Sequence, residues 1–435
     1  MLSLKNLILH NEFFKLFYNK KIIFITLLGF SSGLPLALSG GTLQAWIATT
    51  SADITTIGFL GLIGLPYTVK FLWAPFLDRY SLSKLGRRRS WMAVTQILIA
   101  LVLIFMSFTN PSSDLFLLSM LALSLAFLSA SQDISFDAFR TDSLEENERG
   151  AGAAVSVLGY RIAMLVSGAL ALIFADQLGF RATYLIMSGL MLIGVVTSLL
   201  ATEPQPNIIG PSSFYEAVVD PFKNFFSRGK LAVAFISLVI LYKLGDAFAG
   251  SLTTTFLIRG PGFSLTEIGT INKTLGIVLS ILGALLGGAI LSKIGLYKSL
   301  LIFGILQAVS NLTFMVLAYA GKSYLLFVLA VGFEQLAGGM GTAAFVAFLM
   351  DLCDSRYTAT QFALLSAASA IGRVFVGPPS GFLVDAIGWG PFFLVTFLIS
   401  IPGLILLIAL RGFWQEQTKQ EVFSQNDKTP DFQKD

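Results

Sequence analysis

Acidic and basic residues lie inside long apolar stretches of this sequence, where they can do chemistry. Asp133 and Asp137 are four residues apart, so a helix would place them on one face, with Arg140 one turn further on. A carboxylate in hydrocarbon costs at least about 2.5–3.5 kcal/mol, so this face is expected to turn toward protein or a water-filled path. There the carboxylates could take up protons or contact a polar substrate.

Charges near the middle of the apolar stretches come from both halves of the chain. They are Lys70, Arg161, Asp246, Glu334 and Arg373. Charges at this depth mark substrate or ion pathways by default. Arg161 and Arg373 occupy equivalent positions in the two halves and stay charged in proteins, which favours binding of a substrate anion. The alternative is structural pairing with Glu334 or Asp133.

For two pairs of charges and one single lysine, a structural explanation competes with a functional one. Lys243 and Asp246 are three residues apart and could form a local ion pair. Asp137 and Arg140 could pair in the same way at the membrane surface. Lys273 could either reach toward the outer surface or neutralise a bound anion.

The composition excludes an ordinary soluble domain. Of 435 residues, 55% are hydrophobic and 12% are charged, whereas soluble proteins have about 25% charged residues. The chain has one cysteine, Cys353, and one histidine, His10. An intrachain disulfide and paired-cysteine metal motifs are therefore excluded, and no cofactor or bound metal is expected.

Apolar runs long enough to cross a bilayer, about 20 residues each, recur along the sequence. We therefore predict an all-α integral membrane protein with twelve spans. The predicted spans are 21–47, 56–77, 90–109, 115–138, 150–174, 181–201, 231–257, 264–291, 296–319, 323–350, 358–384 and 390–411.

The distribution of lysine and arginine predicts the topology. The net charge of +4 reflects basic residues concentrated in alternate loops, and the opposite loops hold only Arg181, Arg259 and Lys322. The positive-inside rule then places both termini in the cytoplasm. This placement explains the positive charge without a nucleic-acid partner, and we expect none.

The spans fall into two halves of six that look like parallel repeats. Thr55–Gly58 recurs as Thr266–Gly269, and Gly159–Arg161 is echoed by Ile371–Arg373, each pair at the same span position in its half. The predicted organisation is two six-helix bundles, a linker that carries an interfacial helix, and a disordered cytoplasmic tail. The boundaries are 1–201, 202–230, 231–411 and 412–435.

Glycine and proline interrupt some of these spans. Gly377, Pro378 and Pro379 in span eleven allow the helix to bend or to expose backbone groups. For Gly283 to Gly288 in span eight we favour close packing against a neighbouring helix.

A cluster of charges predicts a gate at the cytoplasmic surface. A carboxylate at a helix end followed by a basic cluster can brace helix ends together in one conformation and release them in another. Ordinary positive-inside charge would look similar. The gate candidates are Asp78, Arg79, Arg87, Arg88, Arg89, Asp137, Arg140, Glu148 and Arg149.

These features resemble the major facilitator superfamily, although Gly86 lies further from Asp78 and Arg79 than the general motif places it. Within the superfamily the sequence is most similar to AmpG-type muropeptide permeases, over nearly its whole length. The stretches that carry this similarity are Gly33–Leu38, Gly41–Trp46, Lys70–Trp73, Ser129–Ile134, Glu148–Ala153, Leu241–Phe248, Ser251–Gly260 and Ala359–Ser366.

The resemblance implies a bacterial inner-membrane permease, not an enzyme, that imports N-acetylglucosaminyl-1,6-anhydro-N-acetylmuramic acid for cell-wall recycling. The substrate would enter with or without its stem peptide. The resemblance also implies proton symport driven by the proton-motive force and a link to β-lactamase induction. We expect a monomer in the lipid bilayer that works by rocking residues 1–201 against residues 231–411.

The polar residues in the spans suit such a substrate, which is large, hydroxylated and anionic. Basic side chains could neutralise carboxylates, and amides, tyrosine and tryptophan could hydrogen-bond sugar groups. The substrate-binding candidates are Gln44, Trp46, Lys70, Gln132, Tyr160, Arg161, Gln335, Gln361 and Arg373. The proton-coupling candidates are Asp133, Asp246 and Glu334.

Two other functions remain as alternatives. One is transport of acetyl-CoA or another anionic metabolite, because related eukaryotic carriers share the Gln-Asp motif of span four. The other is a membrane enzyme that acts on cell-wall intermediates with intramembrane acids as catalysts. Against the enzyme stands the absence from the sequence of an intramembrane histidine and of a recognisable nucleophile motif.

Overall fold

The computed structural model describes residues 20–83, 85–144, 149–204, 223–353 and 358–412. These residues form helices joined by short loops, and no strand occurs among them. The all-α prediction is confirmed. Most of the predicted linker and nearly all of the predicted tail lie outside the described residues; at the end of the predicted interfacial helix, residues 223–226 are described and are helical.

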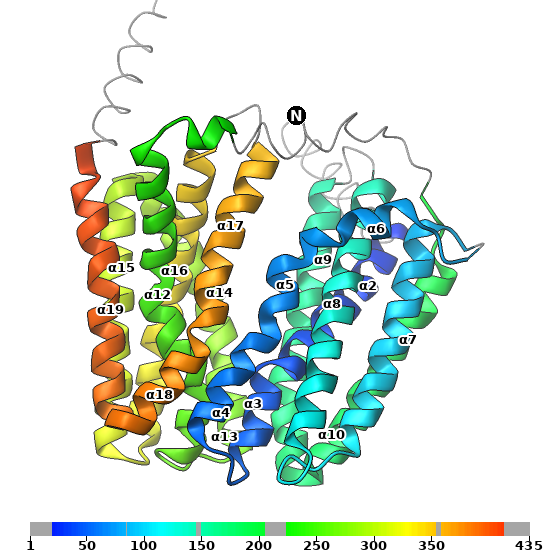
Figure 1. The fold of residues 1–435 in the computed structure, drawn as a ribbon, viewed down its shortest axis with the longest axis horizontal. Helices are drawn as coiled ribbons and strands as arrows, with labels where there is room; N and C mark the ends of the chain where they lie inside the picture. The colour runs from blue at the N-terminus through cyan, green and yellow to red at the C-terminus, as the bar shows by residue number, and fades with distance from the viewer. Residues whose placement is uncertain (1–19, 84, 145–148, 205–222, 354–357, 413–435) are drawn as a thin grey trace, which may run out of the picture.

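The helices form two bundles that stand side by side in Figure 1. The first half consists of α2 (Lys20–Ser39), α3 (Gly41–Ala48), α4 (Ile54–Phe59), η1 (Leu60–Gly64), α5 (Leu65–Val69), η2 (Lys70–Leu72), α6 (Ala74–Arg79), α7 (Arg87–Ser107), α8 (Leu115–Ser143), α9 (Arg149–Met164), η3 (Leu165–Leu170) and α10 (Ala171–Leu200). The second half consists of α12 (Lys230–Arg259), α13 (Leu265–Glu267), η4 (Ile268–Leu275), α14 (Gly276–Ile294), α15 (Leu296–Ala320), α16 (Tyr324–Asp351), α17 (Thr358–Phe375), α18 (Gly377–Ile387) and α19 (Trp389–Ala409).

Two ends of the bundle can be distinguished. We call the end at which α2 begins and α19 finishes the proximal end. The opposite end, where α4, α13 and the last residues of α18 lie, is the distal end (Figure 1). The two halves approach each other at the distal end.

Nine helices of the described chain are long and apolar enough to cross a membrane. The difference from twelve has a structural reason. One stretch of 46 residues, Val155–Leu200, holds two predicted spans that are joined at Gly179, whose φ of 81° interrupts the helix. The predicted spans 56–77 and 358–384 are each divided into shorter helices. The count of twelve therefore stays a prediction.

Proline explains where these divided spans are interrupted. Pro66 lies in the first turn of α5 and Pro378 in the first turn of α18. Proline has no backbone N–H to donate to the preceding turn, so it is tolerated at the start of a helix and ends the helix before it.

Large apolar side chains cover much of the outer surface. Phe116 is 79% exposed, Leu325 is 70% exposed and Leu285 is 67% exposed. A soluble monomer rarely exposes so much contiguous apolar area, so this surface suits contact with lipid hydrocarbon.

Close packing explains the glycines of α14. A Cβ atom added at Gly283 would come within 2.3 Å of the Leu336 carbonyl oxygen on α16, and one added at Gly339 would come within 2.2 Å of the Ser280 carbonyl oxygen. The two helices can approach this closely only where side chains are absent.

Substituting Gly283 with alanine is expected to destabilise the protein. The added methyl group would press on backbone atoms of α16, and overpacking of this kind costs about 1–3 kcal/mol. Thermal unfolding of the purified protein in detergent measures the effect. Gly288→Ala is the matched control, because nothing lies within 4 Å of its added Cβ. Equal unfolding temperatures for the two variants would contradict this account of the helix contact.

Candidate functional site

Asp133 lies in a polar cluster inside the first half. Its Oδ1 accepts a hydrogen bond of 2.5 Å from Ser32 Oγ on α2. The ammonium group of Lys70 acts on the same carboxylate electrostatically, although no ion pair joins them among the described residues. The Tyr160 hydroxyl also lies in the field of Asp133. The structure thus brings together four polar side chains from α2, η2, α8 and α9.

The second half contains a cavity of about 570 Å³. This volume falls in the usual range for small-molecule sites, about 300–1,000 Å³. Its polar lining comes from α12, α14, α16 and α17, and part of this lining is Lys243, Asp246, Ser280, Gln335, Thr342, Ser369 and Arg373. Because it combines cations, an acid, an amide and hydroxyls, the cavity suits a polar and charged ligand.

Two predicted acids have different partners here. Asp246 Oδ2 lies 3.5 Å from Lys243 Nζ, so the local ion pair on α12 is confirmed. Glu334 accepts a hydrogen bond of 2.7 Å from Gln335 Nε2, which is a neutral group.

Lys273 points to the junction of the two halves. Its Nζ donates to Thr254 Oγ1 over 3.3 Å, and a Cβ atom added at Gly41 of the first half would lie 3.3 Å from that Nζ. Its charge also acts on Glu334.

Basic groups exceed acidic groups in the interior that the structure describes. Five basic residues, Lys70, Arg161, Lys243, Lys273 and Arg373, stand against three acidic residues, Asp133, Asp246 and Glu334. Of these eight, Lys243 and Asp246 pair with each other, and the other six form no ion pair with any residue that the structure describes. Arg161 is partly exposed, and Arg373 is exposed and lines the cavity of the second half. The interior can therefore hold an anion.

Three predicted binding residues lie away from these polar groups or are engaged elsewhere. Gln44 Nε2 donates to the Ser251 carbonyl across the two halves over 2.6 Å. Trp46 is buried in the apolar core, where it stacks on Phe180 at 5.3 Å between ring centroids. Gln361 is fully buried and donates to Asn224 Oδ1 over 2.9 Å.

The predicted gate arginines make contacts within the first half. Arg88 Nε lies 3.2 Å from Asp142 Oδ2 on α8. Glu203 accepts from the backbone N–H groups of Arg88 and Arg89 over 2.8 and 3.0 Å, and so caps the start of α7. Arg89 Nε donates to the Ser198 carbonyl near the end of α10. These bonds tie α7 to α8 and α10 at the proximal end.

Asp137 and Arg140 form the expected pair near the proximal end of α8. Their charged groups are 3.2 Å apart, and Arg140 also donates to Ser156 Oγ on α9. Arg87 begins α7 beside Arg88. The structure does not describe the side chains of three further gate candidates, Asp78, Arg79 and Arg149, and the last candidate, Glu148, lies outside the described residues.

Two matching hydrogen-bonded contacts join the halves at the distal end. Asp385 on α18 accepts from the backbone N–H and the hydroxyl of Thr55 at the start of α4. Asp176 on α10 accepts from the same two groups of Thr266 at the start of α13, over 3.2 and 2.6 Å. In each contact a carboxylate of one half caps the first turn of a helix in the other half. We call these two contacts the distal caps.

Glycines beside the distal caps let the halves touch through their backbones. A Cβ atom added at Gly58 would come within 2.5 Å of the Gly377 carbonyl oxygen, and one added at Gly269 would come within 2.7 Å of the Ala169 carbonyl oxygen. The repeated sequence Thr-x-Ile-Gly therefore forms one of the contacts between the halves. Sequence reasoning noticed this repeat but missed its partners.

A signal for those partners was present in the sequence. Leu178 and Gly179 follow Asp176 at two and three residues. Ile387 and Gly388 follow Asp385 at the same spacing. This second repeat falls after spans five and eleven in the predicted order. Comparison of the two halves residue by residue would have found both carboxylates.

Other charges at the distal end stay fixed around neutral pH. Hydrogen bonds from Thr56 hold the pKa of Asp53, which caps α4, below its usual range. A hydrogen bond to Glu267 raises the pKa of Lys322 above its usual value. Asp53 therefore loses its charge only as the pH falls into the acid range, and Lys322 loses its charge only as the pH rises into the alkaline range.

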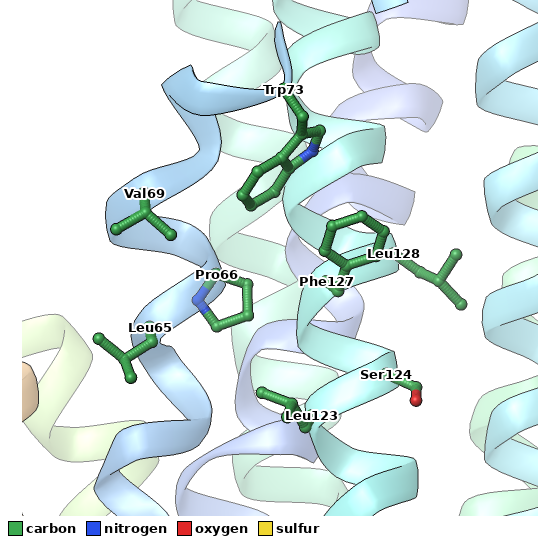
Figure 2. Close-up of a pocket in the computed structure, with 8 residues that line it drawn as sticks. All are labelled: Leu65, Pro66, Val69, Trp73, Leu123, Ser124, Phe127 and Leu128. Carbon is green, nitrogen blue, oxygen red and sulfur yellow. The ribbon is translucent and has the colours of Figure 1, made fainter. Parts of the chain in front are cut away.

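A second cavity of about 590 Å³ lies between α5 and α8, with an almost entirely apolar lining (Figure 2). The lining residues are Leu65, Pro66, Val69, Trp73, Leu123, Ser124, Phe127 and Leu128. The Ser124 hydroxyl donates to a backbone carbonyl of its own helix, and Trp73 Nε1 donates to Ser131. The cavity offers little for a polar ligand to bond, so it does not belong to the polar site.

Comparison with known proteins agrees with this geometry. The sequence model of the Major Facilitator Superfamily matches residues 25–272 and 240–432. The chain is 50% identical over 402 residues to the "Anhydromuropeptide permease" of Escherichia coli (strain K12), covering 92% of this chain and 82% of that protein. It is 34% identical over 406 residues to "Putative transporter AmpG 4" of Rickettsia conorii, covering 91% and 98%. The solved nucleoside transporter NupG shares the fold, with a TM-score of 0.67 at 15% identity over 90% of this chain and 99% of that one.

Removing both distal caps is expected to open the distal end. Each cap to a helix end contributes about 0.5–2 kcal/mol, so Asp176→Ala with Asp385→Ala should raise the fraction of open molecules about fivefold or more. The readout is the rate at which a membrane-impermeant maleimide, offered at the distal end of sealed vesicles, labels Ser251→Cys in a Cys353→Ser background.

Asp114→Ala is the matched control for this experiment. Asp114 is also a distal carboxylate, but its hydrogen bonds are to Asn110 and Ser113 of its own half. An unchanged labelling rate in the double variant, or an equal rise in the control, would contradict the role of the caps.

Proposed function

The chain belongs to the Major Facilitator Superfamily, and we propose that it imports anhydromuropeptides across the bacterial inner membrane for peptidoglycan recycling. The observation that carries this proposal is the 50% identity, over 92% of the chain, to a protein named as an anhydromuropeptide permease. The substrate would be the disaccharide GlcNAc-anhydroMurNAc with or without its stem peptide.

The charge of the interior supports an anionic substrate. A stem peptide and the lactyl group bring carboxylates, and Lys70, Arg161 and Arg373 are cations with no ion-pair partner in the described part of the chain. Arg373 lies in the cavity of the second half, where Ser369 and Gln335 could hydrogen-bond amides. Gln44, Trp46 and Gln361 are engaged or buried elsewhere, so the proposed site does not use them.

The distal caps support alternating access by movement of one half against the other. In this structure they hold the distal ends together, and both must break for the substrate to enter from that side. The positive-inside charges support a cytoplasmic proximal end, with both termini inside. Rocking of the halves requires one chain only, so a monomer suffices.

Proton coupling is assigned to the interior carboxylates. Asp133 and Glu334 are hydrogen-bonded to neutral donors, Ser32 and Gln335, so protonation of either would break no ion pair. Asp246 is held by Lys243, and its protonation would leave that lysine without its partner. We therefore rank Asp133 and Glu334 before Asp246 as proton carriers.

Uptake by the purified protein in proteoliposomes tests the function. Labelled GlcNAc-anhydroMurNAc should accumulate chemically unchanged when the distal side is made more acidic, and an uncoupler should abolish the accumulation. Asp133→Asn and Glu334→Gln should each reduce accumulation at least tenfold. If both variants remain fully active and uncoupler-sensitive, these carboxylates do not carry the proton. Inhibition of wild-type uptake by acetyl-CoA would indicate a different substrate.

The peptide dependence of arginine variants tests anion binding. Arg161→Lys and Arg373→Lys keep a positive charge but lose the planar pair of donors that fits a carboxylate. We expect uptake of the peptide-bearing substrate to fall about tenfold, with a smaller loss for the peptide-free disaccharide. Half-saturation concentrations for the two substrates measure this, and equal losses for both would show that the arginines are structural.

A further inference from the structure

Gln132 is a buried amide with both of its polar atoms unpaired. The residue is 1% exposed, and neither Nε2 nor Oε1 has a hydrogen-bond partner in the part of the chain that the structure describes. An unsatisfied buried polar group costs about 1–3 kcal/mol, so native proteins normally pair such atoms. An amide left unpaired in a transporter interior therefore points to a group that pairs with it during transport.

Two hydroxyl groups near Gln132, those of Ser129 and Tyr67, are also buried. Ser129 lies one helical turn before it on α8, and the Ser129 hydroxyl is buried without a partner among the described residues. The Tyr67 hydroxyl on α5 is also buried, and no described residue partners it with full hydrogen-bond geometry; its contacts with the Ser129 and Ser39 hydroxyls are weak ones. Four unpaired atoms thus gather between α5 and α8.

This cluster is next to the polar groups described above. Asp133 follows Gln132 directly, and its charge acts on the Tyr67 hydroxyl. Lys70 and Tyr160, which interact electrostatically with Asp133, are only partly buried. Gln307 lies elsewhere. It is 3% exposed and also has two amide atoms without a partner among the described residues, but it lies on α15 of the second half, beside Gly341.

The unpaired atoms identify the chemistry of the partner. They belong to one amide and two hydroxyls, so they offer donors and acceptors but no charge. A carboxylate or phosphate would need donors only. Two neighbouring hydroxyls of a sugar each donate and accept, and so match an amide that presents a donor and an acceptor side by side.

We propose that Tyr67, Ser129 and Gln132 form a subsite for the neutral hydroxyl groups of a sugar ring. The inference rests on the proposed function and adds an orientation to it. The sugar hydroxyls bind in the first half, and the anionic end of the substrate lies toward Arg373 in the second half. Tyr67 and Ser129 are thereby assigned to substrate binding.

The test uses Tyr67→Phe, Ser129→Ala and Gln132→Leu, each in the full-length protein. Each variant removes polar atoms that have no full partner among the residues that the structure describes, so its unfolding temperature without ligand should stay equal or rise. Each should raise the half-saturation concentration for uptake of GlcNAc-anhydroMurNAc about three- to tenfold, as expected for the loss of one hydrogen bond. The rise should be the same with and without the stem peptide.

Gln307→Leu is the matched control, because it removes an unpaired buried amide outside the subsite. Its half-saturation concentration should equal that of the wild type. A subsite variant that unfolds at a lower temperature and keeps wild-type half-saturation would show a structural role and overturn the inference. If the wild type itself neither binds nor carries the disaccharide, the proposed function is wrong and the inference fails with it.

Discussion

The cost of placing polar groups in hydrocarbon governs this structure. A charge at mid-depth of the bilayer costs several kcal/mol unless it meets protein, water or ligand, so each interior charge needs a partner. Asp133 is paired with Ser32, Glu334 is paired with Gln335, and Asp246 is paired with Lys243. The interior side chains that remain without a partner among the described residues are mostly cations or neutral polar groups. That remainder suits a substrate that carries both carboxylates and hydroxyls.

The two repeats contribute different chemistry but the same mechanical contact. The first half provides the neutral subsite around Gln132, and the second provides the cavity that contains Arg373. At the distal end the repeats are equivalent, because each gives one threonine and one aspartate to the distal caps. Two equivalent contacts on opposite sides of the interface allow the halves to separate by a rocking motion while each bundle stays intact.

Local patterns predicted the elements better than the partners. Apolar length predicted the helices, and the i,i+3 spacing of Lys243 and Asp246 predicted their ion pair. The partners of Thr55 and Thr266 lie far away in the sequence, and one half alone does not reveal them. Trp46 was predicted to bind substrate because an indole can donate a hydrogen bond, but packing places it in the apolar core. The unpaired state of Tyr67 and Ser129 depends on their surroundings, so it could be recognised only in three dimensions.

Distances between the halves, measured at both ends in one protein by pulsed electron paramagnetic resonance, test the account most directly. In a Cys353→Ser background, spin labels at Ser113→Cys and Ala320→Cys report the distal end, and labels at Thr141→Cys and Lys230→Cys report the proximal end. These four side chains are exposed. With substrate and an acidic buffer, the distal pair should gain a longer distance while the proximal pair gains a shorter one. Distances that change in the same direction at both ends, or at neither end, would contradict alternating access through the distal caps.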